Sequence, residues 1–403
     1  MTPAGPTLSD PAPAPELTVV TPLGLPGVEG YLVVDRRVRG TAWGGLCVLP
    51  DVTLEEITAS ARCMTIKYGF LGLCSGGAKA ALRLPPEHEP VRRRLLAELG
   101  ARWSGHLRDG WNPGLDMGCS LDDLRALLLG AGQPRRAARG SDTSGVYTGW
   151  TVYFAALAAL AHRGRGPKGA TYVVQGFGRV GTEFARRMHA AGARLVGVST
   201  RAGALADLDG LDLHALLELR RAFGDDWVLH APPARRVQPE DLLQLSANVL
   251  VPAARCWALH AANRDAVRAG AVVCAANVAM DPETEVALGE RGVAVVPDFV
   301  ANCGGVLGTT LEGHLGPAHI FALLEGGYRR KVERLLRAAA DSGVPLRALA
   351  SREAETSLDR LAERGRPPAF HAARWVLARL PRFAREPLGY ARARSMFFPE
   401  PGD

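Results

Sequence analysis

The chain has 403 residues, of which 47% are hydrophobic and 22% are charged, and its formal net charge is +7. This length and composition suit two ordinary globular cores, and the longest apolar run is too short to cross a membrane. The arginines are scattered along expected helices rather than gathered in one patch, so the positive charge does not indicate nucleic acid as a partner.

The cysteines and the N-terminal residues favour a cytoplasmic protein. There are seven cysteines, an odd number without a C-x-x-C pair, which argues against a disulfide framework and a zinc cluster alike, and we expect no metal site. The Pro- and Ala-rich residues 1–16 carry none of the basic residues of a signal or transit peptide. We expect them to form a disordered tail.

The chain then predicts an α/β domain over residues 17–140. Strand-like runs at 31–34 and 45–49 alternate with helical patterns at 54–68 and 91–107. Residues 130–144 are polar and rich in turn formers, which is typical of a crossing between domains. We therefore expect a second domain, residues 141–315, to begin near this point.

The second domain carries a dinucleotide-binding pattern. A helix at 149–162 leads to a β-branched strand at 171–175, and a G-x-G-x-x-G segment, a helix and a strand at 194–199 follow. In this order the glycines allow a tight turn and close approach to a pyrophosphate, which the helix N-terminus attracts. We expect a doubly wound Rossmann domain whose cofactor contacts include Gly176, Phe177, Gly178, Arg179, Val180 and Gly181.

The end of the second strand bears on the choice between NAD and NADP. An acidic residue there would bind the ribose 2′-hydroxyl of NAD, but the residues are Ser199, Thr200 and Arg201. A hydroxyl and a guanidinium can hold a 2′-phosphate, which favours NADP over NAD. The alternative is that Arg201 simply points into water.

After Val306 the pattern is helical to the end of the chain. Breaks fall at Pro317, at 343–345 and at Pro367, without the signs of a third domain. We expect residues 316–403 to be helices that pack back on the first domain.

Only four of the basic residues are lysines, and two of them, Lys67 and Lys79, lie close together in a glycine-rich segment. We expect both to face one pocket around a glycine turn, where one lysine can exchange a proton and the other can bind a carboxylate. Asp116, in the apolar segment 112–118, is a candidate acid or base. By spacing alone, a glycine-rich turn with lysines is about equally often a plain loop, and a lone Asp in a loop more often forms an Asx-turn.

Seven segments share their pattern with one known family and stand in its order. They are Gly44–Pro50, Met64–Ala81, Pro113–Gly118, Thr148–Val152, Val251–Ala254, Ala276–Asn277 and Pro297–Val306. On these motifs the chain resembles the glutamate/leucine/phenylalanine/valine dehydrogenases from about residue 33 to residue 312. The resemblance implies NAD(P)-dependent oxidative deamination of an L-amino acid to a 2-oxo acid and ammonium, by a homo-oligomer that assembles through the substrate domain.

The resemblance also implies roles for single residues. Lys67 would bind the substrate α-carboxylate, Lys79 would polarise the carbonyl and a water, and Asp116 would exchange protons at the amino group. Thr309 would supply a hydroxyl near the substrate. Contacts to the nicotinamide and its ribose would come from Thr148, Asn277 and Asn302.

Departures from the family pattern bear on the substrate. Glutamate-specific members carry a lysine just before the Gly44-Gly45 pair, and Trp43 stands there instead. Glutamate is therefore disfavoured, and we expect Trp43 and Gly45 to border an apolar or aromatic side chain, unless the indole fills the pocket itself. Five further replacements indicate an unusual substrate or a declining enzyme: Cys47, Cys74, Ala80, Ala81 and Thr151.

Two other functions compete with this interpretation. A 2-hydroxy-acid dehydrogenase would need a His/Arg pair near the carbonyl, and the histidines offer no matching motif. A non-catalytic, NADP(H)-binding regulatory or scaffold protein could retain the same fold, because fold does not dictate function. It would bind the nucleotide without turning over any amino acid.

Overall fold

The structure is a computed structural model that describes residues 13–137, 143–312, 314–364 and 382–398. The chain divides into two compact units. Among the described residues, unit 1 holds 13–137 and 351–364, and unit 2 holds 143–312, 314–350 and 382–398. None of the described helices combines the length and hydropathy that a bilayer-spanning segment needs.

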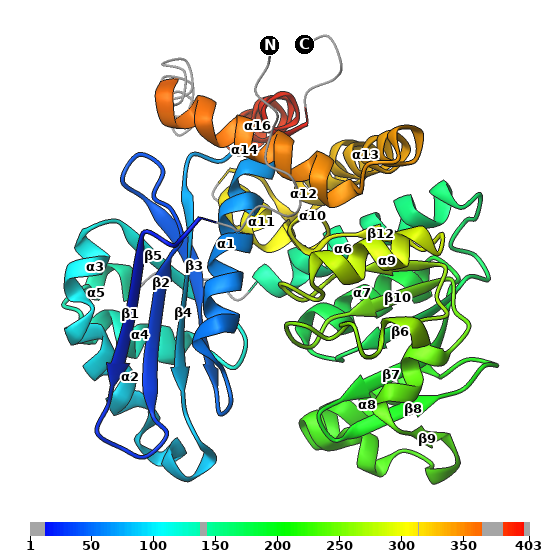
Figure 1. Cartoon of the computed structure of the whole chain (residues 1–403), viewed down its shortest axis with the longest axis horizontal. Helices are drawn as coiled ribbons and strands as arrows, with labels where there is room; N and C mark the ends of the chain where they lie inside the picture. The colour runs from blue at the N-terminus through cyan, green and yellow to red at the C-terminus, as the bar shows by residue number, and fades with distance from the viewer. Residues whose placement is uncertain (1–12, 138–142, 313, 365–381, 399–403) are drawn as a thin grey trace. The chain divides into compact units, whose positions relative to one another are not determined.

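Unit 1 is built on a five-stranded mixed sheet in the order β1-β2-β4-β3-β5, drawn in blue and cyan in Figure 1. β1 pairs antiparallel with β2 and β2 with β4, whereas β3 runs parallel to both β4 and β5. The strands are β1 (Leu17–Pro22), β2 (Glu29–Val34), β3 (Ala42–Leu49), β4 (Gly76–Arg83) and β5 (Trp111–Leu115).

Helices cover both faces of this sheet, because alternate residues of each strand are apolar on opposite sides. Leu32, Leu46 and Ala80 face a core formed with α2 and α4, and Val33, Cys47 and Ala81 face a smaller core under α1. The helices of unit 1 are α1 (Leu54–Phe70), α2 (Arg92–Arg102), α3 (Ser104–Arg108), α4 (Leu121–Gly130), α5 (Pro134–Ala137), the 3₁₀ helix η1 (Pro86–Val91) and, from residue 351 onward, α14 (Leu346–Arg364).

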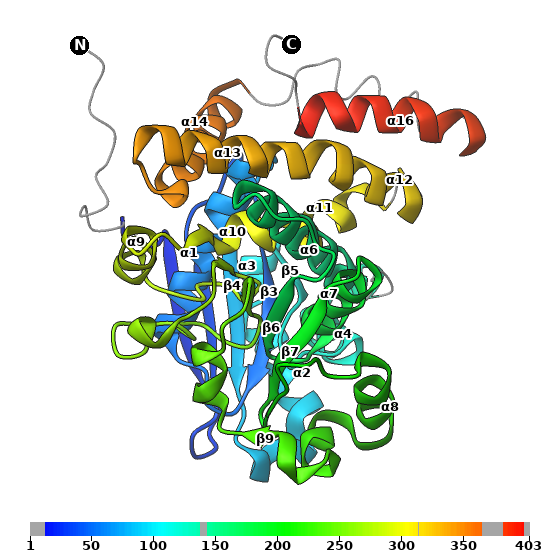
Figure 2. The same ribbon diagram turned by 90° about the vertical axis from the view of Figure 1, so that its right-hand side faces the viewer.

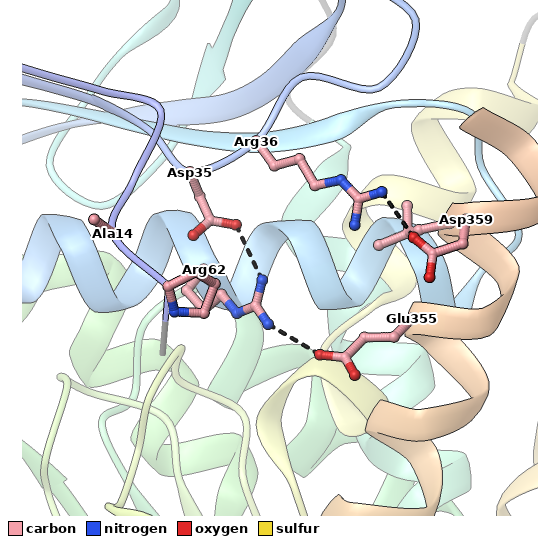
Figure 3. Close-up of a pocket in the computed structure, with 8 residues that line it drawn as sticks. Ala14, Asp35, Arg36, Arg62, Glu355 and Asp359 are labelled. Atoms are coloured by element: carbon pink, nitrogen blue, oxygen red, sulfur yellow. Dashed lines mark hydrogen bonds and ion pairs between the residues drawn. The ribbon is translucent and has the colours of Figure 1, made fainter. Parts of the chain in front are cut away.

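Ion pairs attach α14 to the rest of unit 1 (Figure 3). Arg62 of α1 pairs with Glu355 at 2.9 Å and with Asp35 at 3.6 Å. Arg36 pairs with Asp359 at 2.9 Å. These side chains line a cavity of about 290 Å³ in which positive and negative groups already neutralise one another. We therefore regard the cavity as part of the attachment of α14.

Unit 2 contains a seven-stranded sheet in the order β12-β11-β10-β6-β7-β8-β9. The strands from β12 to β7 are parallel, and β8 and β9 continue the sheet antiparallel. The strands are β6 (Thr171–Gln175), β7 (Arg194–Thr200), β8 (Gly203–Ala206), β9 (Arg236–Val237), β10 (Val249–Pro252), β11 (Ala271–Val273) and β12 (Ala294–Val296). The strand order reverses beside β6, which is where doubly wound sheets bind their ligands.

The helices of unit 2 include a packed group formed by α6, α11 and α13 (Figure 2). The helices are α6 (Ser144–His162), α7 (Arg179–Ala190), α8 (Leu213–Phe223), α9 (Pro282–Glu290), α10 (Asp298–Ala301), α11 (Gly304–Leu311), α12 (Pro317–Leu323), α13 (Arg329–Ser342) and α16 (Arg382–Phe397). Short 3₁₀ turns are η2 (Gly224–His230), η3 (Pro233–Arg235), η4 (Pro239–Gln244) and η5 (Arg264–Ala266), and η6 (Leu324–Tyr328) is a π-helical turn. The C-terminal helices are thus divided between the units.

The structure refines two local predictions. The helical pattern at 91–107 is two helices that are separated at Trp103, whose indole N–H donates to the Thr21 hydroxyl at 2.9 Å. Gly76 and Gly77, just before Lys79, lie in strand β4, and the turn itself falls at residues 71–75. The break expected at Pro367 and the expected tail at 1–16, apart from residues 13–16, lie outside the described residues.

Candidate active site

Helix α1 carries Lys67 in its last turn. A capping box starts the helix: the Thr53 hydroxyl accepts the Glu56 N–H at 3.2 Å, and the Glu56 carboxylate accepts the Thr53 N–H at 3.0 Å. Lys67 is buried near the opposite end, where the partial negative charge of the helix C-terminus favours an ammonium. The local sequence therefore fixes both ends of the element that places this lysine.

Lys79 and Asp116 form a buried ion pair. Lys79 lies in β4 with its side chain 2% exposed, and its ammonium donates to the Asp116 carboxylate, which is 24% exposed. The second carboxylate oxygen accepts the Met117 N–H at 2.7 Å. Lys67 lies in the last turn of α1 and Lys79 in β4, so the two lysines flank the turn at residues 71–75, where Gly72 has a φ of +63°. Both charges act on the Asp116 carboxylate.

These positive charges determine the protonation of Asp116. Burial by itself would raise the pKa of this carboxyl, but the charge and hydrogen bond of Lys79 outweigh it. The Met117 N–H and the charge of Lys67 act in the same direction, so the pKa of Asp116 is lowered. Asp116 is therefore a carboxylate near neutral pH, next to an ammonium with which it can share a proton.

Gly45 makes room for this pair. A Cβ at residue 45 would lie 2.6 Å from the Asp116 Oδ2 and from its Cβ, closer than such atoms approach. Gly45 is opposite Gly114 in β5, and the pairing of Trp43 with Gly77 and of Leu46 with Ala80 places Gly45 beside Lys79. The position borders the ion pair directly.

Trp43 lies on the same sheet face as Gly45, because strand residues two apart point the same way. Its side chain is 47% exposed, and it is opposite Asn112 in β5. The Asn112 side-chain oxygen accepts a hydrogen bond from Arg136 at 2.7 Å. Sequence reasoning missed Asn112 and Arg136, because α5 is adjacent to β5 only in the fold.

Four of the residues that depart from the family pattern are packed inside the two units. Cys47 and Ala81 are opposite each other in β3 and β4 and share the core under α1, and Ala80 lies in the core on the other face. In unit 2, the buried Thr151 hydroxyl accepts the Gly304 N–H at 3.0 Å. None of these four side chains displaces the Lys79–Asp116 pair.

In unit 2, the G-x-G-x-x-G segment begins in the turn between β6 and α7. Gly176 has a φ of +102°, which suits glycine, and its N–H and that of Phe177 donate to the Ser199 carbonyl. A Cβ on Gly178 would meet no atom within 4 Å, and no described side chain caps the first turn of α7. Arg179, Val180 and Gly181 form that first turn, and helix N-termini that follow glycine-rich turns are common phosphate-binding elements in proteins.

The end of β7 offers hydroxyl and guanidinium groups. Thr200 is the last residue of the strand, and its hydroxyl accepts the Ala202 N–H at 3.1 Å. Arg201 is exposed and lies 3.7 Å from the Asp225 carboxylate, a long and solvent-accessible ion pair. Such a pair holds a side chain weakly, so Arg201 is able to turn toward an anion.

Asn277 and Asn302 are joined by a hydrogen bond in unit 2. The Asn302 amide donates to the Asn277 side-chain oxygen at 3.0 Å and to the Ala275 carbonyl at 3.1 Å. Among the described residues, the buried Asn302 Oδ1 and the buried Gln175 Oε1 have no hydrogen-bond donor. Buried acceptors of this kind fit the amide and hydroxyl donors of a nicotinamide nucleotide.

Two predicted hydroxyl residues bond within their own helices. Thr148 of α6 donates to the Ser144 carbonyl at 2.8 Å, and a Cβ on Gly305 would lie 2.7 Å from its hydroxyl oxygen. Thr309 of α11 is exposed and donates to the Gly305 carbonyl at 2.7 Å. Both hydroxyls are thus near the N-terminal turn of α11.

No group of three or more acidic, histidine or cysteine side chains in the described part of the chain is arranged to hold a metal ion. The polar groups described above are an ammonium–carboxylate pair in unit 1 and, in unit 2, a glycine-rich turn before a helix and two hydrogen-bonded asparagines.

The comparisons with known proteins cover both units. Residues 140–344 match the profile of the Glutamate/Leucine/Phenylalanine/Valine dehydrogenases, and residues 19–116 match the Glu/Leu/Phe/Val dehydrogenase dimerisation domain. The chain belongs to the Glu/Leu/Phe/Val dehydrogenase family. It is an amino-acid dehydrogenase, an oxidoreductase.

The proteins similar to this dehydrogenase include glutamate dehydrogenases and a tryptophan dehydrogenase. It is 35% identical over 297 residues to a glutamate dehydrogenase of Thermotoga maritima, covering 69% of this chain and 70% of the relative. Among solved structures, a hetero-hexameric glutamate dehydrogenase from Thermus thermophilus in a Leu-bound form has a TM-score of 0.73 at 29% identity, covering 88% and 91% of the two chains. L-tryptophan dehydrogenase from Nostoc punctiforme has a TM-score of 0.58 at 21% identity, covering 87% and 97%, a likeness of fold.

Proposed function

We propose that this dehydrogenase oxidises an L-amino acid other than glutamate, with an apolar or aromatic side chain. Amino acid, water and NAD(P)⁺ would give a 2-oxo acid, ammonium, NAD(P)H and a proton. The observation that carries the proposal is the intact Lys79–Asp116 pair beside Trp43. The ion pair supplies the chemistry of the family, and the indole stands where a glutamate-specific enzyme has an ammonium.

The residues of unit 1 would act on the reacting amino acid in sequence. Lys67 holds the α-carboxylate, and Asp116 takes a proton from the α-ammonium so that the nitrogen lone pair can form the imine. Bound NAD(P)⁺ supplies the hydride acceptor for the substrate Cα. Lys79 then polarises a water for addition to the imine carbon, and Asp116 returns a proton to the departing nitrogen.

Two features support an apolar or aromatic substrate. The Trp43 indole is half exposed on the face that holds Lys79, so it offers apolar surface to a substrate side chain. A glutamate γ-carboxylate would gain no charge partner from an indole. It would lose part of its hydration there, which is costly for an unpaired charge.

We further propose NADP as the preferred cofactor, held by the six residues 176–181 and by Thr148, Asn277 and Asn302. Thr200 and Arg201 would take the 2′-phosphate, because β7 ends without an acidic residue and Arg201 is held only by a long, exposed pair. Changing Arg201 to Asp should shift the ratio of kcat/KM from NADP⁺ toward NAD⁺ by about tenfold or more. An unchanged ratio would contradict this role for Arg201.

We also infer a homo-oligomer that assembles through unit 1. The matched profile of residues 19–116 is that of a dimerisation domain, and β1 is an edge strand of the described sheet with Val20 exposed on it.

We propose a cytoplasmic location as well. None of the seven cysteines, all within the described ranges, forms a disulfide, which suits a reducing compartment.

The substrate proposal is tested by exchanging Trp43 for lysine. Trp43→Lys should raise kcat/KM for glutamate and lower it for the best apolar or aromatic amino acid, each by about tenfold or more, because an ammonium replaces an apolar contact. Trp43→Phe is the matched control and should keep the apolar preference. Equal effects of both variants on every amino acid would overturn this role for Trp43.

A further inference from the structure

Unit 2 contains a cluster of two buried carboxylates and one arginine, Arg347 at the start of α14, whose side chain is 19% exposed. The Arg347 guanidinium donates to Glu285 at 2.6 Å through Nε and to Asp298 at 2.9 Å through Nη2. The carboxylates of Glu285 and Asp298 are only 4% and 1% exposed. The guanidinium also lies over the Phe299 ring, 5.6 Å from its centroid.

Burying these charged groups costs free energy, because they lose their hydration. Burial raises the pKa of Glu285 despite the charge of Arg347. Burial alone would lower the pKa of Arg347, but the charges of Glu285 and Asp298 outweigh it and raise that pKa. Since buried ion pairs rarely stabilise a protein more than apolar residues of similar volume, stability alone does not account for the cluster.

Asp298 connects the cluster to the segment that follows Asn277. Its Oδ1 accepts from Arg347, and its Oδ2 accepts the Val278 N–H at 2.6 Å. That N–H belongs to the peptide group between Asn277 and Val278. The carboxylate therefore fixes the orientation of the peptide next to a predicted cofactor residue.

The same peptide is held in a strained conformation. Val278 has a φ of +49°, a region that β-branched residues rarely adopt, and its carbonyl accepts the Trp257 N–H at 2.7 Å. Strain of this kind persists only where the surroundings impose it, and it is concentrated at functional sites. The Asp298 carboxylate binds the N–H of this strained residue.

A side-chain hydrogen bond connects Asn277, which precedes the strained residue Val278, to Asn302. The Asn277 side-chain oxygen accepts the Asn302 amide, which leaves the buried Asn302 Oδ1 as an acceptor without a donor in the described residues. A continuous path thus runs from Arg347 through Asp298 and the Asn277–Val278 peptide to Asn302. Asn302 also follows α10, which begins at Asp298.

We propose that Arg347 is a positioning residue for the cofactor site. It holds Asp298, which sets the strained peptide after Asn277 and so aims Asn277 and Asn302 at the nicotinamide end of the dinucleotide. The inference rests on the proposed function, because that function assigns these two asparagines to the cofactor. Neutral side chains of similar size at position 347 would fill the space without orienting the carboxylate.

The test compares Arg347→Met with wild type in the full-length protein. The variant should raise the Kd of NADPH, measured by nucleotide fluorescence, and the KM of NADP⁺ by about tenfold, because small misplacements of contact groups have large effects. The KM of the amino acid should stay within about twofold. Arg347→Lys keeps the charge and should give an intermediate Kd, and it replaces Arg347→Met if that variant does not fold.

Two controls separate positioning from general stability. Arg352→Met removes an exposed arginine of the same helix and should leave both constants unchanged. Glu285→Gln keeps the Arg347–Asp298 contact, so it should lower Tm while the Kd of NADPH stays within about twofold. A Kd unchanged in folded Arg347→Met, or raised equally in Glu285→Gln, would overturn the proposal. Because binding is measured directly, a wild type that binds NADPH but oxidises no amino acid would refute the proposed function and still test Arg347.

Discussion

At the scale of single residues, the Lys79–Asp116 pair combines burial with opposite charge. An ammonium that is 2% exposed would be costly alone, and the carboxylate offsets this cost. The carboxylate is less buried than the ammonium, so it is the partner that a substrate can reach. This asymmetry suits a pair in which Asp116 exchanges protons and Lys79 supplies a fixed positive charge.

The pH dependence of stability follows from the lowered pKa of Asp116. A carboxyl with a lowered pKa in the folded state stabilises the protein above its unfolded pKa of about 4, and this contribution is lost as the pH falls through the folded pKa. Asp116→Asn should therefore lower the free energy of unfolding by about 3 kcal/mol at pH 7, because it leaves Lys79 without its charge partner. Urea titrations from pH 7 to pH 3 should show the difference shrinking at the acid end. A difference that does not vary with pH would contradict this assignment.

Gly45 provides a second prediction at this scale. Gly45→Ala should lower kcat/KM by about tenfold or more, because the new Cβ would displace the Asp116 carboxylate from Lys79. Gly105→Ala adds a methyl group where no atom lies within 4 Å and serves as the matched control. Steady-state kinetics that do not distinguish the two variants would show that Asp116 needs no such clearance.

At the scale of elements, one helix and two strands bring the charged groups of unit 1 together. α1 presents Lys67 from one end, β4 presents Lys79, and β5 ends just before Asp116. The glycines of β4 let α1 pack close to the sheet: a Cβ on Gly77 would lie 2.2 Å from the Thr65 backbone nitrogen. Close helix-to-sheet packing, rather than a turn, is what these glycines permit.

The cap of α1 should affect stability more than catalysis. Thr53→Ala removes the side-chain half of the capping box and should lower the free energy of unfolding by about 1 kcal/mol. Lys67 lies at the opposite end of the helix, so the KM of the amino acid should change little. A rise in KM comparable to that of Lys67→Ala would mean that the cap also positions the lysine.

At the scale of the whole chain, the sequence predicts elements with a strong local signal. The strand at 171–175 and the glycine segment after it are found as expected, because a buried parallel strand and G-x-G-x-x-G are both local patterns. The extended backbone at Lys79 was not predictable from its flanking glycines, which are depleted in strands. The cluster of Arg347, Glu285 and Asp298 joins residues from three separate segments and leaves no periodic signal.

In the candidate site, too, local motifs are predictable from the sequence and long-range contacts are not. The family motifs single out Lys67, Lys79 and Asp116, but only the β3–β4–β5 register shows that Trp43 and Gly45 share the face of Lys79. Asn112 and Arg136 come together across the edge of the sheet. Long-range pairing of this kind depends on tertiary packing, which local propensity does not encode.

We propose that this amino-acid dehydrogenase works through Lys79. The most direct test follows NADP⁺ and NAD⁺ reduction by absorbance at alkaline pH, with wild type and Lys79→Ala, against a panel of standard amino acids. We expect wild type to turn over an apolar or aromatic amino acid faster than glutamate, and Lys79→Ala to lose this turnover while still binding NADPH. Equal turnover by both proteins, or a wild type that binds NADPH and oxidises none of the amino acids, would contradict the account.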